Sequence, residues 1–169
     1  LFTRMIVAPA DHTFCYYNGY VDQTSSHASQ LAKSVCFFSP IQFLFWYDRP
    51  AMAKDEPELE FWKHLPTTWD ETKVLHSKIG AYGVVARRKS RDWFIGCLNA
   101  VEPRTLDVAL DFLPEGQHFV AYIYRDDTSV PTSTKVGIER RHVSSKTVLK
   151  VSMRKQGGVA IRIAPRKAD

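Results

Sequence analysis

Hydrophobic and polar positions in the first fifty residues follow the pattern of a strand, a helix and a second strand. Met5–Val7 form a short apolar run closed by Pro9, which predicts a fully buried strand. The polar stretch Asp11–Ser25 contains glycine and asparagine and predicts a loop. A second apolar run, Ile41–Tyr47, predicts another buried strand. Buried strands joined through a helix are typical of an α/β fold.

Between the two apolar runs, His27–Phe38 has the period of an amphipathic helix. Its apolar positions recur at spacings of four and three residues, and they are Leu31, Val35 and Phe38. Ser25 or Ser26 can cap the first turn, because a serine side chain accepts a hydrogen bond from a backbone N–H there. Residues 1–50 therefore predict one βα unit.

A single βα unit cannot fold alone. A lone strand of a parallel sheet leaves its edges unpaired and two apolar faces uncovered. This favours a larger barrel or sheet upstream of the unit. We expect the isolated 169-residue chain to be poorly soluble, because Met5–Val7 and Ile41–Trp46 would be uncovered.

Residues 51–71 predict a connector, since they are rich in proline and acidic side chains. Within them, Glu58–His64 is long enough for one or two short helical turns. From residue 72 to residue 169, apolar or alternating runs recur at intervals of about ten residues, which indicates antiparallel strands of a β-sandwich. These runs are Tyr82–Arg88, Trp93–Ala100, Thr105–Asp111, Gln117–Arg125, Thr147–Met153 and Gly158–Ala164.

The net charge of +5 is unevenly distributed. From Thr134 onward, ten lysines and arginines face two acidic residues, so this segment alone carries +8. A basic segment can bind nucleic acid. Here the basic residues alternate with Val and Ile, as on a half-buried strand, and this favours a solvated strand face over a nucleic-acid partner. No stretch reaches the roughly 20 apolar residues of a membrane span.

Three cysteines, Cys15, Cys36 and Cys97, are too few and too scattered for a disulfide framework or a metal site. The histidines also lack ligand spacing. The residues themselves therefore predict no metal ligand in this chain.

Several short motifs occur in a fixed order along the chain. They are Leu1-Phe2-Thr3-Arg4, then Ala8-Pro9-Ala10-Asp11-His12-Thr13, then the Pro-Thr-Thr-Trp-Asp-Glu-Thr run within Leu65–Leu75, then Gly80-Ala81-Tyr82 and Trp93-Phe94-Ile95-Gly96. Their order and spacing resemble the carboxy-terminal third of glycoside hydrolase family 97. In that family, Pro-Phe-Thr-Arg lies on the last barrel strand and Gly-Pro-Met-Asp-Tyr-Thr follows it. The likeness covers nearly the whole chain and weakens after about Asp127.

The resemblance implies an amino-terminal β-sandwich, a catalytic (β/α)8 barrel and a carboxy-terminal antiparallel β-sandwich. Residues 1–50 would be the last βα unit of the barrel, and residues 72–169 the sandwich. The implied partners are the upstream barrel and amino-terminal sandwich of the same polypeptide, and an oligo- or polysaccharide substrate. A periplasmic or secreted location is implied as well.

The resemblance also implies hydrolysis of α-glucosides or α-galactosides. The α-glucosidase branch uses paired glutamates and a bound calcium ion, with inversion. Those carboxylates and calcium ligands precede the Phe-Thr-Arg strand. The resemblance therefore assigns no catalytic residue and no metal ligand to this chain.

Asp11 and His12 are the candidates for contact with substrate. If Met5–Val7 is a barrel strand, Asp11 is the one carboxylate at its active end. His12 stands where the family usually has tyrosine. Glycoside hydrolysis needs two carboxyl groups facing each other across the scissile bond, so Asp11 alone is no mechanism. A substrate hydrogen bond and a loop cap are the two interpretations.

Trp69, Asp70 and Glu71 are predicted to fix the joint between barrel and sandwich. Adjacent residues of a strand point to opposite faces, so the two carboxylates cannot act as a catalytic pair. We expect Trp69 to bury against the barrel and Asp70 to accept backbone N–H bonds. Four further aromatic residues could stack on sugars, but an interdomain core is favoured for them: Trp46, Tyr47, Phe61 and Trp62.

Two other classes of function remain open. One is a non-catalytic binding or scaffolding module that uses the basic surface or an aromatic patch. The other is a free-standing carbohydrate-binding sandwich.

Overall fold

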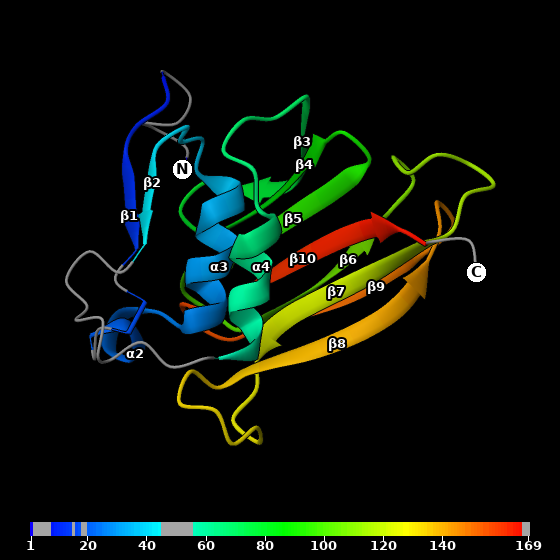
Figure 1. The fold of residues 1–169 in the computed structure, drawn as a ribbon. Coiled ribbons are helices and arrows are strands. Elements are labelled where there is room, and N and C mark those ends of the chain that lie inside the picture. The colour runs from blue at the N-terminus through cyan, green and yellow to red at the C-terminus, as the bar shows by residue number, and fades with distance from the viewer. Residues whose placement is uncertain (2–7, 15, 18–19, 45–55, 167–169) are drawn as a thin grey trace.

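The computed structural model describes residues 1, 8–14, 16–17, 20–44 and 56–166. Most of these residues form three stacked layers, and a small sheet of β1 (His12–Phe14) and β2 (Gln42–Leu44) lies beside them (Figure 1). Helices α3 (His27–Cys36) and α4 (Glu60–His64) cover one face of a six-stranded sheet. The two-stranded sheet of β6 (Arg104–Ala109) and β9 (Val148–Met153) covers the other face. The central sheet is therefore buried from both sides over much of its area.

Both β-sheets of the carboxy-terminal part are antiparallel. The larger contains β3 (Glu71–Lys78), β4 (Tyr82–Lys89), β5 (Asp92–Asn99), β10 (Gly158–Pro165), β7 (Phe119–Asp126) and β8 (Val136–Val143), in that order. The smaller pairs β6 (Arg104–Ala109) with β9 (Val148–Met153). The last strand in sequence, β10, lies in the middle of its sheet, so residues far apart in the chain are held side by side.

The main core lies between the two sheets and follows from the alternation of side chains along each strand. On β9, Leu149, Val151 and Met153 are buried, whereas Val148 and Lys150 point to solvent. The facing side of the large sheet contributes Trp93, Ile95, Cys97, Ala121, Ile123, Val159, Ile161 and Ile163. This core is complete within the residues that follow the connector.

A second core lies between the helices and the opposite face of the large sheet. It joins Leu31 and Val35 of α3 and Phe61 of α4 to Phe94 of β5 and Tyr124 of β7. Strands β5 and β10 are consequently buried on both faces. The continuous apolar pattern of these strands has this physical cause, since neither face meets water.

Two glycines let α3 approach the sheet closely. A Cβ atom at Gly96 would lie 2.5 Å from the carbonyl oxygen of Ala32, and one at Gly158 would lie 2.7 Å from the Cα of Ser29. No side chain fits in either space without moving the helix. Glycine within these strands is therefore required by the docking of α3.

The amino-terminal part contains β1 (His12–Phe14), α2 (Val21–Thr24), α3 and β2 (Gln42–Leu44). Strands β1 and β2 pair in parallel, with the helices between them in sequence. This is the α/β arrangement that the sequence pattern predicts. The described residues contain no closed barrel, so the (β/α)8 barrel stays a prediction.

The connector contains a 3-10 turn, Pro57–Leu59, followed by α4, in agreement with the short helical turns predicted for Glu58–His64. Helix α3 begins at His27 and is capped by Ser26, one of the two predicted caps. The side chain of Ser26 accepts a hydrogen bond of 3.1 Å from the backbone N–H of Ser29.

Two local predictions for the first fifty residues are wrong, and a third concerns residues that the structure does not describe. The segment predicted as one loop, Asp11–Ser25, contains β1 and α2. The helix ends at Cys36, so Phe38 lies beyond it and packs instead against the guanidinium group of Arg87. The predicted strand Met5–Val7 lies outside the described residues.

The described part of the second apolar run is not buried. Ile41 is 52% exposed and Phe43 is 42% exposed, although β2 forms as predicted at Gln42–Leu44. Exposure of this strand is what the sequence predicts when the neighbouring strands of a barrel are missing.

All six predicted strands of the carboxy-terminal part are present, with ends shifted by one or two residues. The sequence pattern missed two strands, β3 and β8. They are the two edge strands of the large sheet. Edge strands carry more polar side chains than central ones, which weakens their hydrophobic signal.

Candidate functional site

The joint between the βα unit and the β-sheets holds most of the polar contacts that link the two parts of the chain.

Asp11 is exposed and immediately precedes β1. His12, the first residue of β1, lies edge-on to Phe14 and Phe37, with ring centroids 4.3 and 4.8 Å apart. Burial, together with the nearby positive charge of Lys33, lowers the pKa of His12 to about 4. A neutral imidazole among aromatic rings serves packing at neutral pH, and the described residues do not test whether Asp11 or His12 contacts substrate.

Trp69, Asp70 and Glu71 enter the large sheet at the start of β3. Trp69 packs on Phe94 with ring centroids 5.6 Å apart, within the core that also contains α3. Asp70 accepts hydrogen bonds from the backbone N–H of Ser90 at 2.7 Å and from Lys89 at 3.1 Å. The hydrogen bond from Ser90 holds the pKa of Asp70 below its usual value. This is the backbone contact expected of Asp70, whereas Trp69 packs on the β-sheet.

Glu71, the third of these residues, pairs with Arg88 across the β3–β4 ladder, at 3.1 Å between Oε2 and Nε. Hydrogen bonds from Lys73 and Arg88 lower the pKa of Glu71. Asp70 and Glu71 are thus both engaged in local contacts at the strand start, and neither faces a second carboxylate across a cleft.

Two glutamates in the first half of the connector, Glu56 and Glu58, are almost completely buried. Tyr16 donates a hydrogen bond of 2.7 Å to Oε1 of Glu58, and Glu56 accepts hydrogen bonds from the backbone and side chain of Ser133. Burial, followed by the charge of Glu58, raises the pKa of Tyr16 well above its usual value, so the phenol remains a donor. These carboxylates tie the loop after β1 and the β7–β8 loop to the connector.

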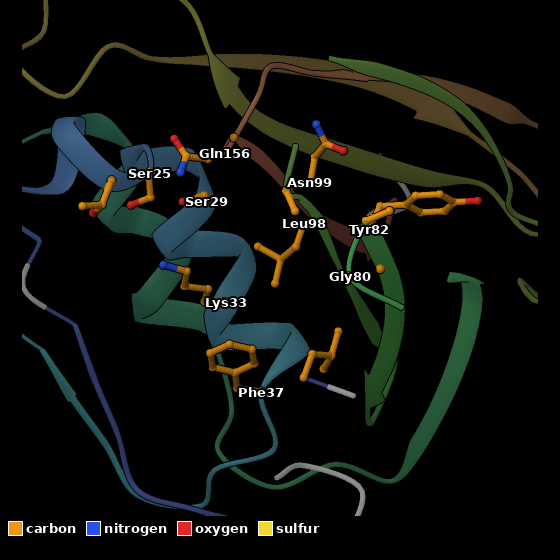
Figure 2. Close-up of a pocket in the computed structure, with 15 residues that line it drawn as sticks. Ser25, Ser29, Lys33, Phe37, Gly80, Tyr82, Leu98, Asn99 and Gln156 are labelled. Atoms are coloured by element: carbon orange, nitrogen blue, oxygen red, sulfur yellow. The ribbon is translucent and has the colours of Figure 1, made fainter. Parts of the chain in front are cut away.

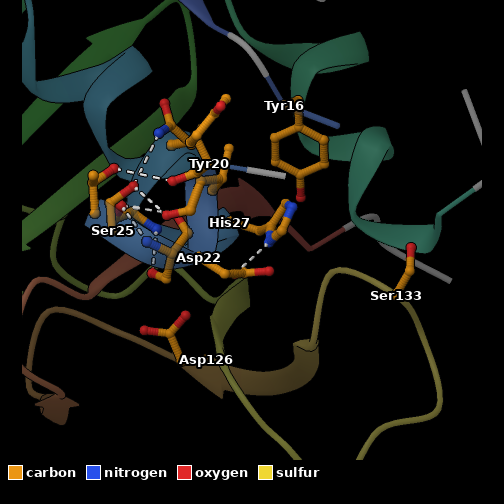
Figure 3. A network of polar contacts seen from close by, with 12 residues as sticks. Tyr16, Tyr20, Asp22, Ser25, His27, Asp126 and Ser133 are labelled. Carbon is orange, nitrogen blue, oxygen red and sulfur yellow. Dashed lines mark hydrogen bonds and ion pairs between the residues drawn. The ribbon is translucent and has the colours of Figure 1, made fainter. Parts of the chain in front are cut away.

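A second set of contacts, which we call the clasp, holds the start of α3 to the β-sheets. It consists of Arg154, Asp126, Ser25 and Ser26. Arg154 donates through Nη2 to the carbonyl of Ser25 at 2.8 Å, and its Nε lies 3.4 Å from Oδ2 of Asp126. Figure 3 shows Asp126 near the junction of α2 and α3, where Ser25 follows α2 and His27 begins α3. Burial raises the pKa of Asp126, while hydrogen bonds from Ser26 and Arg154 oppose that rise.

A groove of about 310 Å³ lies between α3 and the turns at one end of β4 and β5 (Figure 2). Its lining includes Lys33 and Phe37 of the helix side and Tyr82, Leu98 and Asn99 of the sheet. None of the described residues that line it carries a carboxylate. The groove therefore lacks the acid and base of glycoside hydrolysis.

Of the aromatic residues proposed as a sugar platform, Phe61 is fully buried and Trp62 is half-buried, and both belong to the core beneath the helices. Trp46 and Tyr47 lie outside the described residues. Within the described part of the chain there is also no group of three or more histidine, cysteine or acidic side chains that could hold a metal ion. Likewise, no described helix is long and apolar enough to cross a membrane.

Sequence reasoning missed the contacts that define the joint. Tyr16, Glu58 and Arg154 carry no local motif, because their partners lie between 42 and 129 residues away in sequence. Gly96 did carry a signal. A glycine in the middle of an apolar strand indicates a close backbone approach.

Strands β3 to β10 form a β-domain (residues 71–165), and its large sheet packs against helix α3 of the α/β segment. This layered arrangement defines the class of protein: an all-β domain joined to an α/β unit. The match to a protein-family model makes the class specific. Residues 68–164 match the family model described as "Glycosyl-hydrolase 97 C-terminal, oligomerisation". The chain belongs to glycoside hydrolase family 97, and it is a carboxy-terminal portion of a larger polypeptide of that family.

Curated relatives carry related names. A retaining alpha-galactosidase of Bacteroides thetaiotaomicron is 31% identical over 96% of this chain, and a probable retaining alpha-galactosidase of Streptomyces bingchenggensis is 32% identical over 64% of it. The chain spans only 26% and 17% of the lengths of these two proteins.

Solved structures agree with the family and with the fold. A glycoside hydrolase family 97 enzyme from Pseudoalteromonas sp. strain K8, in complex with panose, superposes with a TM-score of 0.77 at 29% identity, over 85% of this chain and 23% of that one. A beta-arabinopyranosidase superposes with a TM-score of 0.67 at 29% identity, over 82% of this chain and 21% of that one. In each case the likeness covers less than a quarter of the solved chain.

Proposed function

We propose that this chain is the end of an α-glycosidase that cleaves α-galactosidic or α-glucosidic bonds. The names of the two curated relatives support α-galactosides, and the panose complex of the Pseudoalteromonas enzyme supports α-glucosides. The catalytic carboxylates would lie upstream. The buried pair Glu56 and Glu58 is unsuited to the role, because substrate cannot reach either side chain.

Within that enzyme, we assign to the β-domain the task of bracing the last helix of the barrel. The observation that carries this proposal is the docking of α3 on Gly96 and Gly158, where backbone meets backbone without an intervening side chain. The clasp fixes the start of the same helix. A helix held at its start and along one face cannot shift without opening the second core.

The proposal also includes a calcium ion in the complete enzyme and export of that enzyme. The described residues do not fit a calcium site, since they offer no cluster of acidic ligands. We therefore assign the calcium ligands of the complete enzyme to residues upstream of this chain. Export to the periplasm or to the medium is proposed on the family resemblance, and cell fractionation with an activity assay tests it.

The decisive experiment uses the complete polypeptide. Its rates on p-nitrophenyl α-galactoside and α-glucoside are compared, with the β-galactoside as the control, before and after treatment with a calcium chelator. Cleavage of either α-glycoside supports the proposal, and the ratio of the two kcat/KM values names the substrate class. Absence of cleavage of both, in a folded protein, would refute it and favour a non-catalytic binding module.

A second candidate function is self-association through the β-domain. The description of the matching family model includes oligomerisation. The edge strands β3 and β8 each have one side without a neighbouring strand in their sheet, and Val74 and Ile138 on them are exposed apolar residues. Light scattering of the complete polypeptide over a concentration series tests this candidate, and a monomer at every concentration would exclude it.

A further inference from the structure

We propose that the uncovered half of the large sheet, on the side that faces the helices, binds an acidic polysaccharide. Under α3 and α4 this side is apolar, and Tyr124, Val136 and Ala160 are buried there. At the other end of β7, β8 and β10, no described helix lies over the sheet (Figure 1). Two residues beyond Val136 on β8, Ile138 is already 38% exposed. The choice of a carbohydrate as partner rests on the proposed glycosidase function, whereas the geometry of the surface does not.

Strand pairing aligns two arginines and a tyrosine across this surface. Arg162 of β10 and Arg140 of β8 are both paired with Tyr122 of β7, which lies between them. The guanidinium carbon of Arg162 lies 5.8 Å from the centroid of the Tyr122 ring, and that of Arg140 lies 5.3 Å from it. We call these three residues the arginine–tyrosine row. Contact with a ring orients a planar guanidinium group while its N–H donors remain at its edge.

Further basic side chains surround the arginine–tyrosine row. Residues two apart on a strand share a face, which places the exposed His142 beside Arg140 on β8. Arg166 and His118 extend the pairing of β10 with β7 through a backbone hydrogen bond of 3.0 Å, and both are exposed. Positive charge gathered on one surface attracts anions and raises their local concentration.

The two arginines of the row differ in what they already bind. Arg162 donates hydrogen bonds of 3.0 and 2.9 Å to Oδ2 of Asp92, so its charge is balanced within the chain. Arg140 is exposed and forms no ion pair with a described carboxylate. Its fork of N–H donors matches the two oxygens of a carboxylate. We therefore expect a carboxylate of the ligand to bind at Arg140.

A polysaccharide whose sugar units carry carboxylates fits this surface better than a protein does. The side chains between the cations are small, Ala164 on β10 and Val120 on β7, and a stable protein interface needs a larger apolar centre. The curated relatives are named as alpha-galactosidases, and a solved relative is in complex with panose. An enzyme of this kind meets polymers of sugars, and binding to a polymer would keep the enzyme close to its substrate.

Isothermal titration calorimetry of the complete polypeptide tests this proposal, with polygalacturonate as the acidic polysaccharide and dextran as the neutral one. Arg140→Gln removes the proposed contact. Arg141→Gln is the matched control, since Arg141 is the next residue of the same exposed strand, points to the opposite face and binds Glu139 there at 2.6 Å. Both variants lose one positive charge. At physiological salt, Arg140→Gln should weaken the binding of polygalacturonate about tenfold, as expected for one charge-assisted contact, and Arg141→Gln less than twofold.

Four results would overturn the proposal. Equal weakening in the two variants would show that only net charge matters, and no effect of Arg140→Gln would show that the ligand binds elsewhere. Absence of wild-type binding to polygalacturonate would exclude this ligand class. Tighter binding of poly-glutamate or of a single-stranded RNA would favour an acidic protein or a nucleic acid instead. The p-nitrophenyl glycosides carry no carboxylate, so polygalacturonate binding by a protein that cleaves neither α-glycoside would refute the activity and leave the surface standing.

Discussion

The βα unit and the β-domain of this chain are stabilised in different ways. The β-domain encloses its main core between two sheets that it builds itself, with Trp93, Ile95 and Ile161 among the buried residues. The described residues of the βα unit enclose no comparable core of their own, and Ile41 and Phe43, at and next to the start of β2, are exposed. The main core of the β-domain is complete within that domain, whereas the packing of the βα unit depends on what lies beside it.

The difference shows that the stability of α3 comes largely from tertiary contact. A ten-residue helix is marginal in water by itself, because nucleation is costly. Here α3 is held by the large sheet on one side and by its capping serine at its start. The contacts of α3 are therefore where the two parts can be uncoupled experimentally.

The largest effect is expected from filling the space at Gly96. Gly96→Val would place side-chain atoms where the carbonyl of Ala32 and the Sγ of Cys36 lie. The helix must move, at a cost of about 3 kcal/mol. Native-state hydrogen exchange of the complete polypeptide measures this as a lower opening free energy for peptides of α3. As the control, Ala109→Val on exposed β6 should change the opening free energy by less than about 0.5 kcal/mol. Unchanged protection of α3 in Gly96→Val would show that α3 does not dock here.

The next effect concerns Tyr16. Tyr16→Phe removes the donor of the 2.7 Å hydrogen bond to the fully buried Glu58 and leaves a carboxylate oxygen unsatisfied, which costs about 2 kcal/mol. Hydrogen exchange should increase in the connector and in the loop after β1, and leave β9 unaffected. Tyr122→Phe is the control, since the Tyr122 ring stacks with Arg140 and Arg162 and keeps its contacts without the hydroxyl. Faster exchange throughout the β-domain would contradict the assigned local role.

A smaller effect is expected at the clasp. Arg154→Met keeps the aliphatic stem and removes the hydrogen bond to Ser25 and the ion pair with Asp126. The loss should be about 1 kcal/mol, because the Arg154 side chain is half exposed and its ion pair is screened by solvent. Lys155→Met, one residue further in the same turn, provides the matched control. Hydrogen exchange in the first turn of α3 should be faster in Arg154→Met than in Lys155→Met. Equal exchange rates in the two variants would show that the clasp does not stabilise the start of α3.

Lowering the pH should destabilise the βα unit before the β-domain, because protonation of His12 opposes its burial. Its pKa in the folded protein is about 4, against 6.5 in an unfolded chain. Between these values the unfolded state binds more protons, so stability is full above pH 6.5 and is lost as the pH falls towards 4. Hydrogen exchange of β1, compared at the two ends of this range, measures the loss. His12→Tyr should reduce the pH dependence of hydrogen exchange in β1. His142→Gln, at an exposed position of β8, should leave that pH dependence unchanged. An equal pH dependence in His12→Tyr would contradict the assignment.

The smallest effect is expected on the basic surface. Lys146→Glu combined with Lys155→Glu reverses two exposed charges of the basic segment. If that segment is a solvated strand face, neither glycosidase activity nor stability should change measurably. Binding of a single-stranded RNA oligonucleotide, followed by fluorescence anisotropy, should be absent in both proteins at physiological salt. Salt-dependent binding that the double variant loses would favour the scaffolding interpretation over the bracing one.

The strands that could be predicted from the sequence are those with one or two apolar faces. On β9 every second side chain is buried, and this regular pattern is visible without a structure. The missed strand β8 contains Glu139, Arg140, Arg141 and His142 in succession, because it is an edge strand and one face has only partial cover. A charge cluster of that kind cannot be told from a loop by periodicity alone.

The joint could be predicted only in part. The sequence indicated that Asp70 would accept backbone hydrogen bonds, since an aspartate at a strand start does so locally. It could not indicate that Arg154 reaches Ser25, because nothing in local spacing records a contact across 129 residues. The role of Asp11 and His12 remains a prediction, since their neighbours in a complete barrel lie outside this chain.

The double burial of β5 and β10 has a consequence for where this domain can be cut. The family match begins at residue 68, yet the helix that covers Phe94 and Ala160 is formed by residues 27–36. A truncated protein that started at the family boundary would expose that apolar face to water and invite aggregation. The boundary read from sequence similarity and the boundary of the physical folding unit therefore differ by about forty residues, as α3 belongs to both parts at once.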